Sequence, residues 1–189
     1  MNNKPVASAS LSYGLTLVEL VITMAVLAVL LSISIPSFTP LIERWRTNQA
    51  LSELESILFY ARSEGIRRGG NLSLTRISDN SNCASTTKEW QCGWQLIQDS
   101  NQDGMSDSGT APIKTNNSFN KIIISASDLG NKITIDRWGK LSLLDGDNSV
   151  SSFSFSAYPP SKLSNEYPKL CIKSGGHLIK IKASDSCNG

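Results

Sequence analysis

The sequence predicts an α+β fold in which one long N-terminal helix packs on an antiparallel β-rich head. The first observation behind this prediction is a helical pattern that runs from residue 15 to residue 69. The second is a change of apolar period after that point, from roughly 3.6 residues, typical of a helix, to roughly 2, typical of a strand. A chain of 189 residues with a formal charge of +2 suits one ordinary head domain and gives no overall electrostatic footprint for nucleic acid.

The helix is expected to begin in an apolar segment. Of the 21 residues from Leu15 to Ile35, 16 are Ala, Val, Ile, Leu or Met, and only Glu19 is charged. As a helix this segment is about 31 Å long, which matches the hydrocarbon core of a bilayer. The sequence therefore predicts that the first half of the helix spans a membrane, to about Pro36.

Three interpretations compete for this segment. A secretory signal peptide needs a basic start and a small-residue cleavage site, for which Lys4 and residues 32–34 are the candidates. A permanent single-span anchor explains the length equally well. Neither interpretation explains Glu19, because a carboxylate in an apolar helix is costly in lipid unless it has a partner.

The third interpretation rests on residue order. Residues 12–20 read SYGLTLVEL and lead into the apolar run. This order resembles the class III leader and first helix of the type IV pilin superfamily. The resemblance implies that residues 1–14 are a leader, that a prepilin peptidase cuts after Gly14, and that the new amino terminus at Leu15 is methylated.

The same resemblance gives Glu19 and Pro36 roles in assembly, as the fifth and twenty-second residues of the mature chain. A newly exposed α-amino group is a cation, and a carboxylate of a neighbouring subunit neutralises it in an apolar bundle. Glu19 is therefore expected to set the register of assembly with other major and minor pilins. The head is expected in the periplasm, held by the inner membrane until an assembly platform extracts the subunit into a pilus or pseudopilus.

Residues 41–68 are predicted to continue the helix as an amphipathic segment. The apolar positions fall at steps of three and four, at Leu51, Leu54, Leu58, Ala61 and Gly65. This stripe is expected to face a covering sheet. Gly69 and Gly70 are expected to end the helix.

The charged residues of this segment alternate in sign at helical spacing. The arginines are Arg44, Arg46, Arg62, Arg67 and Arg68, and the glutamates are Glu43, Glu53, Glu55 and Glu64. An arginine cluster can bind phosphate, but the interleaved glutamates favour a solvated, salt-bridged face. Glu53, Arg62 and Glu64 are expected to turn away from the sheet.

After the helix, short apolar runs are separated by Gly, Asn, Asp, Ser or Pro, which is typical of antiparallel strands. Residues 70–189 are expected to form one head, with strands at 72–77, 94–98, 122–124, 133–135, 141–143, 153–155, 170–172 and 178–181. The clearest hairpin turns at Ser174, Gly175 and Gly176 and joins the last two of these strands.

Three stretches of the chain resemble the FimT/GspH minor pilins and pseudopilins. Residues 58–66 resemble the end of their helix, with Gly65 in place of the usual alanine. Residues 92–104 resemble their Gly-Trp segment and the Asp/Asn-rich stretch after it, and residues 133–139 resemble their strand-and-glycine element. The resemblance implies a pilin fold with a two-sheet head and a place in a tip or priming complex.

The four cysteines fit a head that reaches the oxidising periplasm, where cysteine pairs form disulfides. Four cysteines allow three connectivities. Local pairing favours Cys83 with Cys92 and Cys171 with Cys187. Because the chain has no Cys-x-x-Cys motif and only one histidine, a structural role is favoured over a metal or redox site.

One loop carries a candidate calcium site. Carboxylate and amide oxygens recur two or four residues apart, at Asp99, Asn101, Asp103 and Asp107. The twelfth position of a calcium loop is Thr110 here, in place of a bidentate glutamate. An Asx-rich turn is therefore favoured, and no metal or other cofactor is expected.

The sequence gives no support for catalysis. It contains no Gly-x-Ser-x-Gly motif and no phosphate-binding loop, and His177 has no evident acid partner. The chain is therefore not expected to be an enzyme.

DNA binding is a secondary hypothesis. Some FimT-type pilins carry a C-terminal Gly-Arg-x-Arg element that contacts DNA, and Gly176 and His177 stand at the matching place here. Both arginines are missing. His177, Lys180 and Lys182 are the candidate contacts, and the lysines give weak phosphate attraction rather than specific recognition.

These features together predict a minor type IV pilin that is incorporated into a pilus or primes its assembly, with a role in adhesion, twitching or DNA uptake. Two alternatives stay open. One is a minor pseudopilin of a type II secretion system, which would act in protein transport. The other is a DNA-binding pilin receptor for natural transformation.

Overall fold

The computed structural model describes residues 14–78, 83, 88–127, 130–145, 148–150 and 152–187 of the chain. The chain divides into two compact units, residues 1–41 and residues 42–189. A single helix, α1 (Leu17–Arg68), contributes residues to both units. It has 52 residues and continues through Pro36 and Pro40.

The first unit consists, over its described residues, of the N-terminal part of α1 and the residues that lead into it. The large apolar side chains described there are all exposed, with Leu20 the least exposed at 48% and Leu17 the most at 81%. Over the described residues, no helix combines the length and the apolar character that crossing a bilayer requires. The membrane span expected to about Pro36 therefore stays a prediction.

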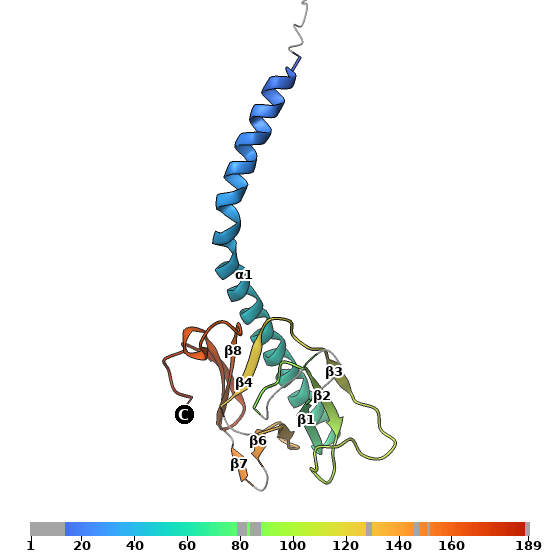
Figure 1. Cartoon of the computed structure of the whole chain (residues 1–189). Coiled ribbons are helices and arrows are strands. Elements are labelled where there is room, and N and C mark those ends of the chain that lie inside the picture. Colours follow the sequence, from blue (N-terminus) through green and yellow to red (C-terminus); the bar gives the residue numbers. More distant parts are fainter. Residues whose placement is uncertain are drawn as a thin grey trace, which may run out of the picture. The chain divides into compact units, whose positions relative to one another are not determined.

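The second unit contains the rest of α1, two antiparallel sheets and a short 3-10 helix, η1 (Ser164–Glu166) (Figure 1). The six-stranded sheet has the order β3-β2-β1-β5-β6-β7. Its strands are β1 (Leu72–Arg76), β2 (Trp94–Gln98), β3 (Lys114–Asn116), β5 (Lys132–Ile135), β6 (Leu141–Asp145) and β7 (Asn148–Val150).

The four-stranded sheet has the order β10-β9-β8-β4. Its strands are β4 (Ile123–Ala126), β8 (Phe153–Tyr158), β9 (Lys169–Lys173) and β10 (His177–Ile181). The hairpin expected at residues 174–176 joins β9 to β10, with Lys173 opposite His177. The predicted α+β class and the antiparallel two-sheet head are confirmed.

One hydrophobic core joins α1 to both sheets. The helix contributes a stripe that is 3% exposed or less, made of Ala50, Leu51, Leu54, Ile57, Leu58 and Ala61. Trp94 comes from the larger sheet and Phe155 from the smaller one, and both side chains are fully buried. The amphipathic pattern of the second part of α1 therefore follows from its position against two apolar sheet faces.

The end of α1 is fixed by glycines. The Gly70 N–H donates to the Gly65 carbonyl at 2.7 Å, and Gly69 has a φ of +77°, which together form a Schellman-type cap. Gly65 also has a packing role, because a Cβ there would lie 2.5 Å from the Ile135 Cγ2 atom. This contact explains why glycine stands where the resembling pilins usually have alanine.

Two expectations about the helix surface were wrong. Glu64 is 8% exposed and not turned toward solvent, because its carboxylate forms salt bridges with Arg67 and Arg68 at the end of α1. Arg62 is half-buried and not turned away either, because its guanidinium binds backbone carbonyls of the head.

Candidate functional site

The start of α1 is held by a capping box. The Glu19 N–H donates to the Thr16 hydroxyl at 3.2 Å, and the Glu19 carboxylate accepts from the Thr16 N–H at 3.2 Å and from the Thr16 hydroxyl at 3.1 Å. The spacing Thr-x-x-Glu is a sequence signature of this motif. Glu19, expected only as an assembly residue, therefore also begins its own helix.

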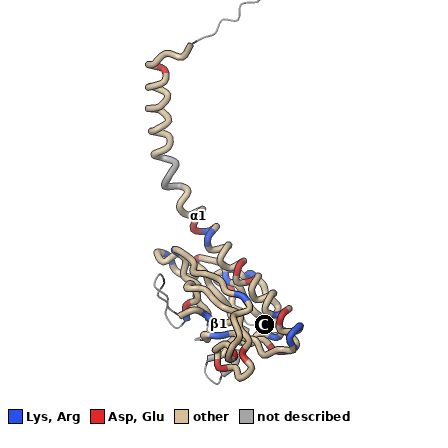
Figure 2. The backbone as a smooth tube through the Cα atoms, turned by 90° about the vertical axis from the view of Figure 1, so that its right-hand side faces the viewer, with Lys and Arg blue, Asp and Glu red and all other residues tan. Residues whose placement is uncertain are grey.

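The apolar assembly surface is defined here as the exposed, mostly apolar face of residues 15–32 and 38–41, whose side chains are described. Charged positions gather in the second part of α1, and only one acidic position marks its start (Figure 2). Of the other expected assembly and processing residues, Gly14 and Leu15 lie just before α1, and Pro36 lies within it. No described contact engages Gly14 or Leu15.

A charge cluster closes the other end of the helix. Arg67 Nη2 lies 2.5 Å and Arg68 Nε 2.7 Å from the Glu64 Oε2 atom. The hydrogen bonds from Arg67 and then Arg68 hold the pKa of Glu64 below its ordinary value of 4.5. The same pairing raises the pKa of Arg67. Two of the five helix arginines are thus salt-bridged on their own helix and not clustered around a phosphate site.

Arg62 joins α1 to one turn in each sheet. Its Nε donates to the Gly139 carbonyl at 2.9 Å, in the connection between β5 and β6. Its Nη1 donates to the Gly176 carbonyl at 2.6 Å, in the turn between β9 and β10. Both acceptors are more than 70 residues away along the chain, so sequence spacing gives no sign of either bond.

The candidate calcium loop is organised by its own hydrogen bonds. Asp99 is fully buried, and its carboxylate accepts from the N–H groups of Asp103 and Gly104, each at 2.9 Å, and from the Ser73 hydroxyl at 2.6 Å. These three donors use three of the roughly four lone-pair sites of the carboxylate. The Asp107 carboxylate binds the backbone N–H and hydroxyl of one serine, Ser100.

Asp103 and Asn101 complete the same loop. The Asp103 carboxylate accepts from the Met105 N–H at 2.7 Å and from the Asn101 side-chain amide at 2.9 Å. These bonds, the one from Met105 first, lower the pKa of Asp103. The described residues contain no cluster of three or more His, Cys, Asp or Glu side chains suited to a metal ion. The geometry is that of a series of Asx turns.

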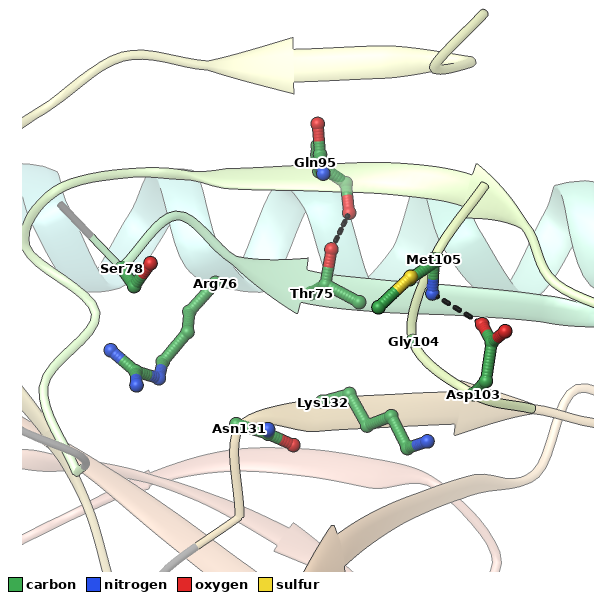
Figure 3. Close-up of a pocket in the computed structure, with 9 residues that line it drawn as sticks. All are labelled: Thr75, Arg76, Ser78, Gln95, Asp103, Gly104, Met105, Asn131 and Lys132. Atoms are coloured by element: carbon green, nitrogen blue, oxygen red, sulfur yellow. Dashed lines mark hydrogen bonds between the residues drawn. The ribbon is translucent and has the colours of Figure 1, made fainter. Parts of the chain in front are cut away.

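A cavity of about 330 Å³ lies between this loop and the larger sheet (Figure 3). Its floor is a cross-strand row, in which Thr75 of β1 stands opposite Gln95 of β2 on one side and Lys132 of β5 on the other. The Lys132 ammonium binds the carbonyl of Gln102 and so fastens the loop over the row. Arg76 and Asp103 add one charge of each sign to the lining. The cavity brings amides and charges together, with no histidine or thiol among its lining residues.

Both disulfides join cysteines that are close in sequence. Cys83 is bonded to Cys92, nine residues away, and Cys171 to Cys187, sixteen residues away. The first closes a loop that contains the buried Trp90, and the second fastens the segment after β10 to β9.

The three candidate DNA contacts lie on or beside β10. His177 and Lys182 are exposed. Lys180 is engaged with the helix, since its Nζ lies 3.1 Å from the Glu55 carboxylate and donates to the Ser52 hydroxyl at 3.0 Å. The structure therefore does not combine the three side chains into one free basic surface.

Comparison with known proteins identifies one matching family and a small set of solved structures with a similar fold. The model of the family described as type II transport protein GspH matches residues 50–176, about two thirds of the chain. A comparison with curated protein sequences gave no match.

Among solved structures, the type IV minor pilin FimU of Pseudomonas aeruginosa matches in two crystal forms, each at 22% identity. The TM-scores are 0.52 and 0.55, and the matches cover 74% and 78% of this chain and 98% and 99% of the FimU chain. The minor pseudopilin EpsH from the type 2 secretion system of Vibrio cholerae also matches, at 10% identity and a TM-score of 0.48, over 74% of this chain and 99% of its own. The likeness to FimU is one of fold.

Proposed function

Because the chain belongs to the GspH family, we propose that it is a minor type IV pilin, a filament subunit and not an enzyme. In this proposal a prepilin peptidase removes residues 1–14 by cutting after Gly14 and methylates Leu15. The subunit then enters a pilus or primes its assembly, in contact with other major and minor pilins. The apolar assembly surface of α1 is the observation that carries the proposal.

That surface needs a cover. Its large apolar side chains are all about half exposed or more, and burying the part of each that is still exposed contributes about 1–2 kcal/mol. Lipid covers the surface in the inner membrane, and the helices of neighbouring subunits cover it in the filament. Since both environments are apolar, the transfer from one to the other costs little hydrophobic free energy, which suits a subunit that an assembly platform extracts.

Glu19 favours transfer of the subunit from the membrane into the filament. Among the residues that the structure describes, its carboxylate is bound to Thr16 alone, within its own first turn. A carboxylate surrounded by apolar groups is stabilised far more by a cation than by neutral hydroxyl and amide donors. In the filament the carboxylate meets the α-amino group of a neighbouring Leu15, which makes correct register more favourable than any other.

The disulfides support a periplasmic head, because such bonds form and persist in oxidising compartments. A filament that extends out of the cell must start with its subunit heads on the periplasmic side of the inner membrane. Pro36 lies near the end of the apolar segment, where the helix passes to its amphipathic part.

Replacement of Glu19 tests this function. We expect Glu19→Ala to reach wild-type amounts in the inner membrane and to be depleted at least tenfold from sheared filaments, measured by immunoblot. Glu55→Ala is the matched control, since it removes a carboxylate of the same helix that pairs with Lys180 on the head, and it should be incorporated normally. Equal incorporation of Glu19→Ala and wild type would contradict the proposal.

A second candidate function is that of a minor pseudopilin in a type II secretion system, since the family is described by its part in type II transport. Both functions use the same leader, helix and head. Deletion of the gene distinguishes them: loss of twitching or of surface pili indicates the pilus, and retention of secreted enzymes in the periplasm indicates the pseudopilus.

The DNA-receptor alternative draws less support, because Lys180 is already paired with Glu55. A salt-dependent gel shift by the full chain, lost in Lys182→Ala, would be needed to revive it.

A further inference from the structure

A second cavity, of about 340 Å³, lies between α1 and the connection from β3 to β4. The helix side contributes Trp45, Gln49 and Glu53, the end of β3 contributes Asn116, and the connection contributes Asn117 and Asn120. We call this cavity the amide groove. Its size is at the lower end of the range for small-molecule sites, so it suits a ligand of one or two rings.

Carboxamides are the most frequent side chains of the lining. Four of the ten lining residues are Asn or Gln, and each carboxamide offers both donors and an acceptor. A sugar hydroxyl is likewise a donor and an acceptor at once. A row of neighbouring hydroxyls is therefore the ligand chemistry that such a lining matches best.

The groove is electrically neutral. Arg46 and Glu53 are its only charged lining residues. Both Glu53 oxygens are already occupied, Oε1 by the Gln49 amide at 3.1 Å and Oε2 by the Asn116 amide at 3.0 Å. An anion would meet Glu53 and a cation would meet Arg46, so an uncharged ligand is favoured over either.

Trp45 supplies an apolar face at the edge of these polar groups. It is 64% exposed, whereas Trp90 and Trp94 are fully buried. Exposing an indole to water is unfavourable, and burying it against a ligand would be favourable. Proteins therefore keep few exposed tryptophans beyond those that function needs. The C–H face of a sugar ring fits against such a ring, and it leaves the hydroxyls at the rim for the carboxamides.

The groove is preformed by contacts behind it. Phe119 stacks on Trp94 with ring centroids 5.2 Å apart and an interplanar angle of 27°, and its N–H donates to the Gln91 carbonyl at 2.8 Å. Asn116 closes against Gly93, where any Cβ would overlap the Asn116 carbonyl. Binding therefore requires little ordering of the loop, which favours a measurable affinity for a small ligand.

We propose that the amide groove binds a neutral saccharide, with one sugar ring stacked on Trp45 and its hydroxyls hydrogen-bonded to Gln49, Asn117 and Asn120. The inference stands on the groove alone and does not depend on the filament role proposed above.

The test uses the full chain in micelles of a detergent without a sugar headgroup, since an alkyl glycoside would compete. The probes are methyl glucoside, methyl galactoside, N-acetylglucosamine, maltose and lactose, measured by saturation-transfer NMR and by titration of tryptophan fluorescence. We expect saturation transfer to the ring protons of at least one probe. We expect binding to weaken at least tenfold in Trp45→Ala and severalfold in Asn117→Ala and Asn120→Ala.

Trp138→Ala is the matched control, because Trp138 is the other exposed tryptophan, at 78%, and lies outside the groove. It should bind as wild type does. Circular dichroism checks that each variant is folded. The proposal is overturned if no probe binds at millimolar concentration, if Trp45→Ala binds as tightly as wild type, or if Trp45→Ala changes only self-association of the chain.

Discussion

The Glu64 carboxylate pairs with two arginines at the C-terminal end of α1. Its side chain is 11% exposed and receives both Arg67 and Arg68. These contacts lower its pKa in the folded chain below the ordinary value of 4.5. A carboxyl group with a depressed folded pKa binds its proton more readily in the unfolded chain, so it stabilises the fold above the unfolded pKa.

The pH dependence follows with its sign. The contribution of Glu64 is complete above about pH 4.5 and is lost as the pH falls through the lower, folded pKa. We expect Glu64→Gln to have a lower free energy of unfolding than wild type at pH 7, and the difference to shrink steadily below pH 4.5. Urea unfolding of the full chain in micelles, followed by tryptophan fluorescence, measures it. Glu166→Gln, at an exposed carboxylate of η1, is the control, and a difference that grows toward low pH would contradict the assignment.

At the residue scale, the sequence predicts spacing better than it predicts partners. The Thr16 to Glu19 spacing is that of a capping box, a signal that the assembly role expected for Glu19 does not use. A charged residue beside an apolar stripe usually faces water, so the helical pattern does not predict that Arg62 and Glu64 bind partners on the protein. For Arg62, the acceptors are carbonyls of glycines far along the chain, which carry no side-chain signal.

At the element scale, α1 depends on Arg62 for its connection to the ends of both sheets. Two hydrogen bonds from a charged donor to carbonyls contribute together about 2 kcal/mol when partly exposed. We expect Arg62→Met to lose about this much, with faster amide hydrogen exchange in both turns that Arg62 contacts. Hydrogen exchange of the full chain, measured by mass spectrometry, checks this expectation. If only one of the two turns loses protection, the two hydrogen bonds of Arg62 contribute unequally.

The exposed Arg137, in the same β5–β6 connection as Gly139, provides the control. Arg137→Met removes the same charge without touching either carbonyl. Its exchange should remain that of wild type, whereas equal effects of the two substitutions would attribute the loss to charge alone.

The strands that could be predicted are those with buried alternation. In β5 the burial alternates strictly, with Ile133 and Ile135 inward, and in β2 Trp94 and Leu96 are both fully buried. Two strands had no such signal. β3 has the sequence Lys-Thr-Asn with two exposed residues, and β7 has the sequence Asn-Ser-Val. Both are at the edges of the larger sheet, where pairing depends on the neighbouring strand and not on a core-facing pattern.

At the scale of the whole molecule, the two disulfides limit the unfolded chain to different extents. A crosslink across sixteen residues stabilises a fold by about 3 kcal/mol through loop closure, and one across nine residues by roughly half a kcal/mol less. We expect Cys171→Ser/Cys187→Ser to lower the free energy of unfolding slightly more than Cys83→Ser/Cys92→Ser does. Urea unfolding of the two double variants under non-reducing conditions measures the difference, and a reversed order would point to native-state contacts in place of loop closure.

The groove and the cavity near Asp103 belong to this scale as well, because each is built from segments distant in sequence. The amide groove needs residues 45–53 and residues 116–120 together, and neither segment has a binding motif of its own. The sequence predicts the helix and the sheet that support it. It does not predict how the connection after β3 folds back against the helix.

The order of the strands has a practical consequence for anyone who shortens this protein. The chain makes β1 to β3 in one sheet, β4 in the other, β5 to β7 back in the first, and β8 to β10 in the second. No single cut can therefore release one sheet intact from the other. A fragment that ends after β4 leaves β1 without β5 and β4 without β8. A shortened version of the head must therefore keep residues 72–181 whole, together with the stripe from Ala50 to Ala61 that α1 packs into the core and with Cys187, which closes the second disulfide.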